Sequence, residues 1–234
     1  MTRSDLGLLL LHALPLDGRM WESQRALLPE RTYAPDLYKL GDNLQQWAEQ
    51  CLKHVPAKRL VVVGCSVGGS CALEILRLAP ERVAASVLIG TKARHDPEPE
   101  SATEALKTIE TQGVAAAWER FWEPLFELPN HTAARERCRA IAMEQSPKDL
   151  MNGVAAFHTR ASREDVVETS TSPIHVVSGA LDAFPGLAYA RRLTALAPSA
   201  QLHVIDECGH YTPLAKPSET TSIIADVVSR ASAS

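Results

Sequence analysis

The stretch Arg59–Gly69 reads RLVVVGCSVGG, a strand-forming run that passes directly into a Gly-x-Ser-x-Gly. Its first half is short, apolar and β-branched, which is typical of a buried strand. Apolar side chains then recur at helical spacing until Pro80, and they predict a helix: Cys71, Ala72, Ile75, Leu76 and Ala79. A strand that turns into a helix through a serine flanked by glycines has the pattern of a nucleophile elbow.

The residue types of this elbow suit a reactive serine. Small residues on both sides let strand and helix approach closely, so that the Ser66 hydroxyl stands clear of the sheet on a strained turn. Ser66 also precedes a helix, whose unpaired N–H groups and dipole favour a developing negative charge. The alternative interpretation is a tight turn with a solvent-facing serine, and the flanking strand and helix patterns argue against it.

Composition narrows the class of protein. The chain has 234 residues, of which 45% are hydrophobic and 22% charged, with a formal net charge of −4. These values suit a globular fold, either one large domain or a core with a modest insertion, and give no basic surface for nucleic acid. The five cysteines are scattered without a Cys-x-x-Cys, so we expect them to be reduced core residues of a cytoplasmic protein. No stretch is long enough to predict a membrane span.

Short apolar strands alternate with helical patterns at both ends of the chain, which predicts an α/β fold with a mostly parallel, doubly wound sheet. A loop at residues 12–21 is expected to lead into a helix in which Trp21, Leu27 and Leu28 pack. The other strands are expected at Leu6–Leu11, Thr32–Leu37, Val83–Gly90, Ile174–Ser178 and Gln201–Ile205, and the other helices at Asn43–Val55, from Pro185 and from Pro217.

The alternation stops between residues 93 and 170, where no strand-like run occurs. Four helical patterns are expected there: Glu98–Gln112, Val114–Leu128, Thr132–Gln145 and one that begins at Ser146-Pro147. The sequence thus predicts an α/β core formed by residues 1–92 and 171–234, with an all-helical cap of residues 93–170 inserted into it.

Two later strands supply partners for Ser66. A serine hydroxyl needs an adjacent base, normally an imidazole that a carboxylate holds in place. His210 follows the last strand and Asp182 the strand before it, and the carboxyl ends of parallel strands share one edge. Asp182 could instead be a turn or helix-capping residue; the rival acids are Asp96, beyond the Val83–Gly90 strand, and Asp206, which lies too close to His210 along the chain.

The oxyanion of an acyl-transfer reaction needs two donors. We expect the backbone N–H groups of Val67 and of Leu14, in the loop after the first strand. His12 is expected to be structural, and Cys65 to point into the core. The remaining histidines have no ligand-like spacing, so no metal and no cofactor are expected.

Three blocks carry a resemblance to a known superfamily. They are His12-Ala13-Leu14-Pro15 with Gly18-Arg19-Met20-Trp21, the Gly64–Gly69 elbow, and Gly179-x-x-Asp182 followed by Gly209-His210 and Pro217-Ser218-Glu219. The chain resembles the α/β-hydrolase superfamily, in its small-capped esterase and non-haem perhydrolase branch, where Ser-Asp-His is the expected order. Two features differ from that pattern: Ala13 replaces the usual glycine, and one or two N-terminal strands are missing, which implies a shortened sheet edge.

The resemblance and the residues together imply a serine hydrolase that cleaves a small to medium, largely apolar carboxylic ester. The cap is expected to supply pocket residues, with candidates Trp118, Phe121, Trp122, Leu125 and Met151. Lactone, thioester and carbon–carbon bond hydrolysis and perhydrolysis use the same three groups, and a ligand-binding receptor with a retained triad is the non-enzyme alternative. The expected partner is a small ester or lactone, with neither nucleic acid nor membrane involved, and the sequence does not indicate an oligomeric state.

Overall fold

The computed structural model describes residues 5–126 and 131–233, and their strands form one six-stranded parallel sheet. The strand order is β2-β1-β3-β4-β5-β6. The strands are β1 (Leu6–Leu11), β2 (Thr32–Tyr33), β3 (Arg59–Cys65), β4 (Val83–Ile89), β5 (Ile174–Gly179) and β6 (Ala200–Ile205). The predicted α/β sheet is therefore confirmed.

The register of the sheet brings the carboxyl ends of its strands level. Leu11 pairs with Gly64, and Cys65 pairs with Ile89. Gly179, the last residue of β5, pairs with Ile205, the last residue of β6. The loops that follow β1, β3, β5 and β6 consequently leave the sheet at one edge, where side chains from distant parts of the sequence meet.

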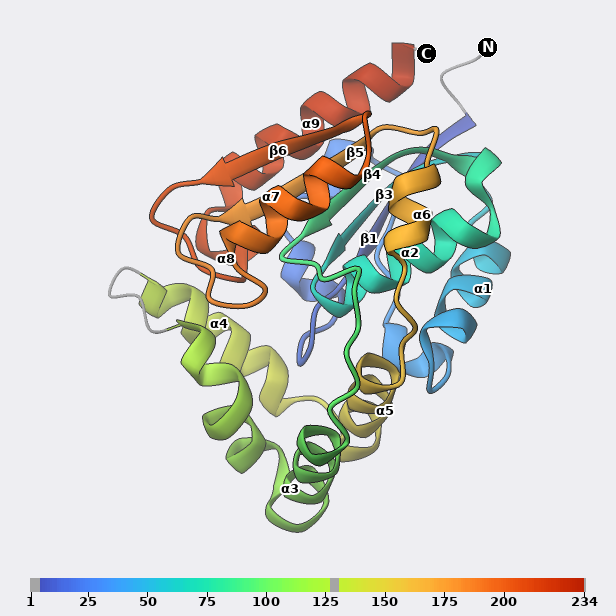
Figure 1. Ribbon diagram of the computed structural model, residues 1–234. Helices are drawn as coiled ribbons and strands as arrows, with labels where there is room; N and C mark the ends of the chain where they lie inside the picture. The colour runs from blue at the N-terminus through green and yellow to red at the C-terminus, as the bar shows by residue number, and fades with distance from the viewer. Residues whose placement is uncertain (1–4, 127–130, 234) are drawn as a thin grey trace.

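Helices cover both faces of the sheet. Helices α1 (Leu44–His54), α2 (Val67–Leu78), α6 (Glu164–Thr169) and α7 (Leu187–Leu196) form one layer, and α9 (Pro217–Ala233) packs against β1, β3 and β4. Figure 1 shows α7 in front of the sheet and α9 behind it. Helix α1 begins where expected because Asn43 caps it by accepting the Gln46 N–H at 3.0 Å.

A group of helices between β4 and α6 lies beyond the carboxyl ends of the strands (Figure 1). It consists of α3 (Pro99–Ala117), a π-helical turn (Trp118–Trp122), a 3₁₀ turn (Glu123–Phe126), α4 (Thr132–Met143) and α5 (Pro147–His158). The expected boundary at Gly113 is present as a kink with φ +86° inside α3. The expected helix Val114–Leu128 is instead divided between α3 and the two turns, and its last two residues lie outside the described residues.

Several local predictions were wrong. The second strand ends at Tyr33, because Pro35 has no N–H to donate to a sheet. Leu37–Leu40 forms a 3₁₀ helix instead. Short 3₁₀ helices at Gly18–Trp21 and Arg25–Leu27 replace the helix expected after β1, and another follows α2 at Pro80–Arg82. Neither α6 nor the short α8 (Thr212–Ala215) was predicted, and α7 begins at Leu187, two residues after Pro185.

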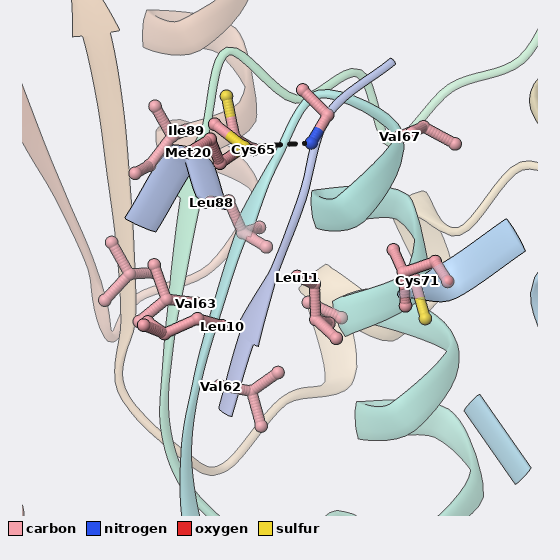
Figure 2. Close-up of a cluster of buried hydrophobic side chains, with 14 of the residues drawn as sticks. Leu10, Leu11, Met20, Val62, Val63, Cys65, Val67, Cys71, Leu88 and Ile89 are labelled. Atoms are coloured by element: carbon pink, nitrogen blue, oxygen red, sulfur yellow. Dashed lines mark hydrogen bonds between the residues drawn. The ribbon is translucent and has the colours of Figure 1, made fainter. Parts of the chain in front are cut away.

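The elbow rests on a dense apolar core. Figure 2 draws Cys65 among the side chains of this core, which include Leu10, Val63, Leu88 and Ile89. All five cysteines are buried and free. Burial raises the pKa of the Cys65 thiol well above its ordinary value, so this neighbour of Ser66 stays protonated. Within the described ranges, no helix is both long and apolar enough to cross a membrane.

Candidate functional site

Ser66 lies on the turn between β3 and α2 in a conformation that few non-glycine residues adopt. Its φ is +53° and its ψ −118°, which is strained for an L residue. The backbone tolerates the strain because the Ser66 N–H donates to Ile89 O at 2.8 Å. Gly68 permits the close approach of α2 to the first strand, since a Cβ there would lie 2.2 Å from Leu11 O.

His210 and Asp182 meet at this edge of the sheet. His210 Nδ1 lies 3.2 Å from Asp182 Oδ2 and 3.3 Å from Oδ1, and their side chains are only 3% and 1% exposed. Asp182 Oδ1 also accepts the Phe184 N–H at 2.8 Å. With Nδ1 donating to the carboxylate, Nε2 is the nitrogen of the neutral imidazole that is free to take a proton.

The two rival acids lie elsewhere. Asp96 is exposed and pairs with Arg94 at 3.0 Å and with Lys92 at 3.6 Å. Asp206 follows β6 directly and is also exposed. Asp182 is therefore the carboxylate that the fold brings to His210.

Gly90 belongs to the site, although the sequence patterns did not single it out. It directly follows β4, with φ +52°, and a Cβ there would lie 2.9 Å from both Cε1 and Nδ1 of His210 and 3.2 Å from Asp182 Oδ2. A side chain at this position would occupy space that the imidazole and the carboxylate need. The signal in the sequence was a glycine at a strand end, which is too common to interpret alone.

The expected oxyanion donors lie beside Ser66. Val67 is the first residue of α2, where a backbone N–H has no partner within the helix. Leu14 lines the same cavity as Ser66 and His210. The structure places Val67 directly after Ser66 and Leu14 in the wall of the cavity; the use of their backbone N–H groups stays a prediction.

His12 holds the loop after β1 in place. Its Nε2 accepts the Leu37 N–H at 2.8 Å, and its Nδ1 lies 3.3 Å from Ala13 O. Burial lowers the pKa of His12 to about 4, so the ring is neutral with its proton on Nδ1. The structural role expected for His12 agrees with these contacts.

A cavity of about 460 Å³ connects Ser66 and His210 with the helices beyond the sheet. Of the five predicted pocket residues, Phe121, Trp122 and Leu125 line it. Trp118 and Met151 do not: Trp118 is fully buried against Phe126, with ring centroids 5.7 Å apart, and Met151 packs on the core. Leu14, predicted as an oxyanion donor, also lines it. The rest of the wall was not predicted and comprises Ser101, Glu104, Ala105, Val154, Phe157, His158, Phe184 and Tyr211.

Polar groups gather on the side of the cavity formed by α3 and α5. Glu104 of α3 pairs with Arg120 of the π-helical turn. His158 ends α5, and burial, together with the charge of Arg160, lowers the pKa of its imidazole. Ser101 and Glu104 also line an outer groove along α3. The cavity thus has an apolar body and a polar end, and it shares Ser101 and Glu104 with this groove.

No group of three or more histidine, cysteine or acidic side chains within residues 5–126 and 131–233 could hold a metal ion. The side chains that the fold gathers at the site offer a hydroxyl, an imidazole and a carboxylate. Such an arrangement can transfer an acyl group through a covalent serine intermediate.

Comparisons with known proteins place the chain in a family. A profile of the alpha/beta hydrolase family matches residues 8–222. A pimeloyl-[acyl-carrier protein] methyl ester esterase of Aromatoleum aromaticum is 32% identical over 97% of this chain and 99% of its own. A 2-hydroxymuconate semialdehyde hydrolase of Pseudomonas sp. strain CF600 is 25% identical over 97% of this chain and 88% of its own length.

A solved structure shares the fold over nearly the whole length. This structure is a thermophilic esterase from Thermogutta terrifontis. The match covers 97% of this chain and 90% of the esterase, with a TM-score of 0.88 and 24% sequence identity. Since the family profile covers most of the chain, the chain belongs to the alpha/beta hydrolase family and is a hydrolase of that fold.

Proposed function

We propose that the chain is a carboxylic-ester hydrolase in which Ser66 is the nucleophile, His210 the general base and acid, and Asp182 the group that orients the imidazole. One observation carries the proposal. Ser66 and His210 open on the same cavity, and His210 Nδ1 is held by the buried Asp182 carboxylate. This arrangement leaves Nε2 to take a proton from a hydroxyl that the elbow presents.

Acylation follows from these positions. Ser66 Oγ attacks the ester carbonyl carbon as its proton passes to His210 Nε2, and the carbonyl electron pair moves onto oxygen. The N–H groups of Leu14 and Val67 stabilise that oxyanion. The intermediate then expels the alcohol, which takes the proton from His210 and leaves an acyl group on Ser66.

Deacylation repeats the sequence with water. His210 takes a proton from the water as its oxygen attacks the acyl carbon, and the second oxyanion forms at the same donors. Collapse breaks the bond to Ser66 Oγ, which recovers its proton from His210, and the carboxylic acid leaves. Neither half of the cycle requires a metal ion or a cofactor.

The lining of the cavity supports a proposal for the class of substrate. Its body is lined by apolar side chains, among them Phe121, Leu125 and Val154, and its volume of about 460 Å³ suits a small to medium group. The acyl or alcohol part that lies there is expected to be uncharged. Lactones, thioesters and substrates of carbon–carbon bond hydrolysis or perhydrolysis are alternatives for the same three groups.

A second candidate is the activity named for the relative from Aromatoleum aromaticum, hydrolysis of the methyl ester of a carrier-bound acyl chain. The observation that favours it is the groove along α3, which shares Ser101 and Glu104 with the cavity. A chain that reacts at Ser66 could leave through this groove toward a bulky carrier. Under this proposal, the carrier-bound methyl ester is hydrolysed faster than a free methyl ester of the same length.

A fluorophosphonate probe tests the reaction class. We expect it to label the wild type at Ser66, and we expect short p-nitrophenyl esters to be hydrolysed. Ser66→Ala should abolish both, whereas Ser70→Ala, one helical turn along α2, should retain both. A folded wild type that is not labelled would favour a receptor and contradict the proposal. Parallel assays with lactones and thioesters then rank the substrate classes by kcat/KM.

A further inference from the structure

Two buried tyrosines donate to consecutive carbonyl groups of the loop after β1. Tyr211 Oη donates to Leu14 O at 2.7 Å, and Tyr38 Oη donates to Ala13 O at 3.3 Å. Tyr211 is only 2% exposed and Tyr38 only 1%. The two residues come from distant segments, Tyr38 before α1 and Tyr211 after His210, yet both act on the peptide groups around Leu14.

The orientation of the Leu14 N–H follows from the carbonyl that shares its peptide plane. The Ala13–Leu14 bond is trans, so the Leu14 N–H points opposite to the Ala13 carbonyl. That carbonyl accepts from Tyr38 Oη, from the Leu16 N–H at 2.8 Å and from His12 Nδ1 at 3.3 Å. These three donors hold the Ala13 carbonyl oxygen, and because the Leu14 N–H points away from that oxygen within the same plane, they also fix the direction of the N–H.

Tyr211 holds the next peptide and links it to the catalytic base. Its ring lies edge-on to the His210 imidazole at 5.0 Å and stacks on Phe126 at 4.7 Å with an angle of 5°. The same ring lines the cavity beside Ser66. One side chain therefore contacts the loop that carries Leu14, the His210 ring and the helical segment beyond the sheet.

Both hydroxyls stay protonated over the working range of an enzyme. Burial raises the pKa of Tyr38 and of Tyr211 well above the ordinary value. A phenol that keeps its proton donates to a carbonyl at every pH of interest. The two contacts therefore persist whether His210 is neutral or protonated.

We propose that Tyr38 and Tyr211 are positioning residues of the oxyanion hole, which fix the peptide groups on either side of Leu14 so that its N–H meets the developing oxyanion. The proposal rests on the proposed function, because it assigns a purpose to the Leu14 donor. The alternative is that the hydroxyls only satisfy two buried carbonyl groups. The two views differ in what removal of a hydroxyl does to transition-state binding.

Tyr211→Phe and Tyr38→Phe remove one hydroxyl each and keep the rings. Tyr189→Phe is the matched control, because Tyr189 Oη accepts the Arg94 N–H at 2.9 Å in another part of the fold. Loss of a whole oxyanion donor costs about 10²–10³ in kcat. Since the Leu14 N–H stays and loses only its fixed direction, we expect about a tenfold to hundredfold loss in kcat for Tyr211→Phe, with KM within about twofold.

Two readouts separate this role from a structural one. Affinity for a trifluoromethyl ketone, which forms a tetrahedral adduct with Ser66, should fall by the same factor as kcat/KM, whereas affinity for the carboxylic acid product should not change. The pH profile of kcat/KM should drop in height without a shift of its inflection, because His210 and Asp182 are untouched. Tyr189→Phe should alter neither readout.

The outcomes are distinguishable. If both variants keep wild-type kcat/KM and wild-type affinity for the ketone, as Tyr189→Phe is expected to, the hydroxyls only satisfy carbonyls and the proposal is overturned. An inflection that moves with Tyr211→Phe would show an effect through His210 and would also overturn it. If Tyr38→Phe does not fold, Tyr211→Phe decides alone. A folded wild type whose Ser66 does not react would overturn the proposed function and this proposal together.

Discussion

Substitution of Gly90 by alanine tests whether the space beside His210 sets the rate. Gly90 has φ +52°, and an added Cβ would lie 2.9 Å from the imidazole. An ordinary Cβ contact begins at about 3.4 Å, so the ring or the strand end has to move by up to about half an ångström. The His210–Asp182 contact, at 3.2 Å, is already at the long end of a hydrogen bond, so a movement that separates the two groups weakens it.

The size of the effect can be worked from these distances. A misplacement of about 1 Å costs about a hundredfold in rate, so half that shift, together with a longer Nδ1–carboxylate bond, predicts a loss of about tenfold to hundredfold in kcat/KM. For stability, a left-handed alanine costs about 1–2 kcal/mol and overpacking about 1–3 kcal/mol. The melting temperature of a chain of this size should fall by about 5–15 °C.

Gly113→Ala provides the matched control. Gly113 also has a positive φ, +86°, but a Cβ there would meet nothing within 4 Å. It should lose about 1–3 kcal/mol of stability from the backbone alone and keep wild-type kcat/KM. The assay combines thermal unfolding with hydrolysis of a p-nitrophenyl ester well below the melting temperature. If Gly90→Ala stayed within about threefold of wild-type kcat/KM, or if Gly113→Ala lost as much activity, the steric argument would be refuted.

Three further predictions concern the acid, the cavity wall and pH. Asp182→Asn should lower kcat by about 10³–10⁴-fold while Asp96→Asn stays within about twofold; the reverse would reassign the acid. Phe121→Ala should move the optimum of a p-nitrophenyl ester series to longer acyl chains, and Met151→Ala should not; an equal shift in both would contradict the cavity assignment. Burial lowers the pKa of His12 to about 4 in the folded chain, whereas its pKa in the unfolded chain is about 6.5. Below about pH 6.5 the unfolded chain therefore binds a proton that the folded chain does not, and the free energy of unfolding falls by up to about 3 kcal/mol toward pH 4. The drop in melting temperature between pH 7 and pH 4.5 should therefore be smaller in His12→Gln, and an unchanged drop would count against this pKa.

The sheet and the meeting of Ser66, Asp182 and His210 could be anticipated from local patterns. A β-branched run followed by Gly-x-Ser-x-Gly specifies its own turn, and parallel strands bring their carboxyl ends to one edge. The choice between Asp182 and Asp96 was harder to predict from the sequence, since each residue follows a strand. It depends on which residues each carboxylate contacts in the fold, and Asp96 forms ion pairs with Arg94 and Lys92.

The wall of the cavity was harder to predict because the helices that form it are irregular. Helical spacing assigns side chains to a face only while the period of 3.6 holds. The chain kinks at Gly113 and then makes a π-helical turn at Trp118–Trp122, so residues past the kink change face. Trp118 turns into the core beside Phe126, while Phe121 and Trp122 face the cavity.

Residues that position the site differ in kind from those proposed to do its chemistry. A nucleophile or a base must be one of a few side chains, so its identity alone draws attention to it. Tyr211 acts on Leu14 across 197 positions of sequence, and Gly90 acts by leaving room for an imidazole 120 residues later in the chain. Their effect depends on where the fold puts them. If the tyrosine proposal and the steric argument for Gly90 both hold, variants of this chain that keep the serine elbow, Asp182 and His210 will differ in kcat according to the residues at positions 38, 90 and 211.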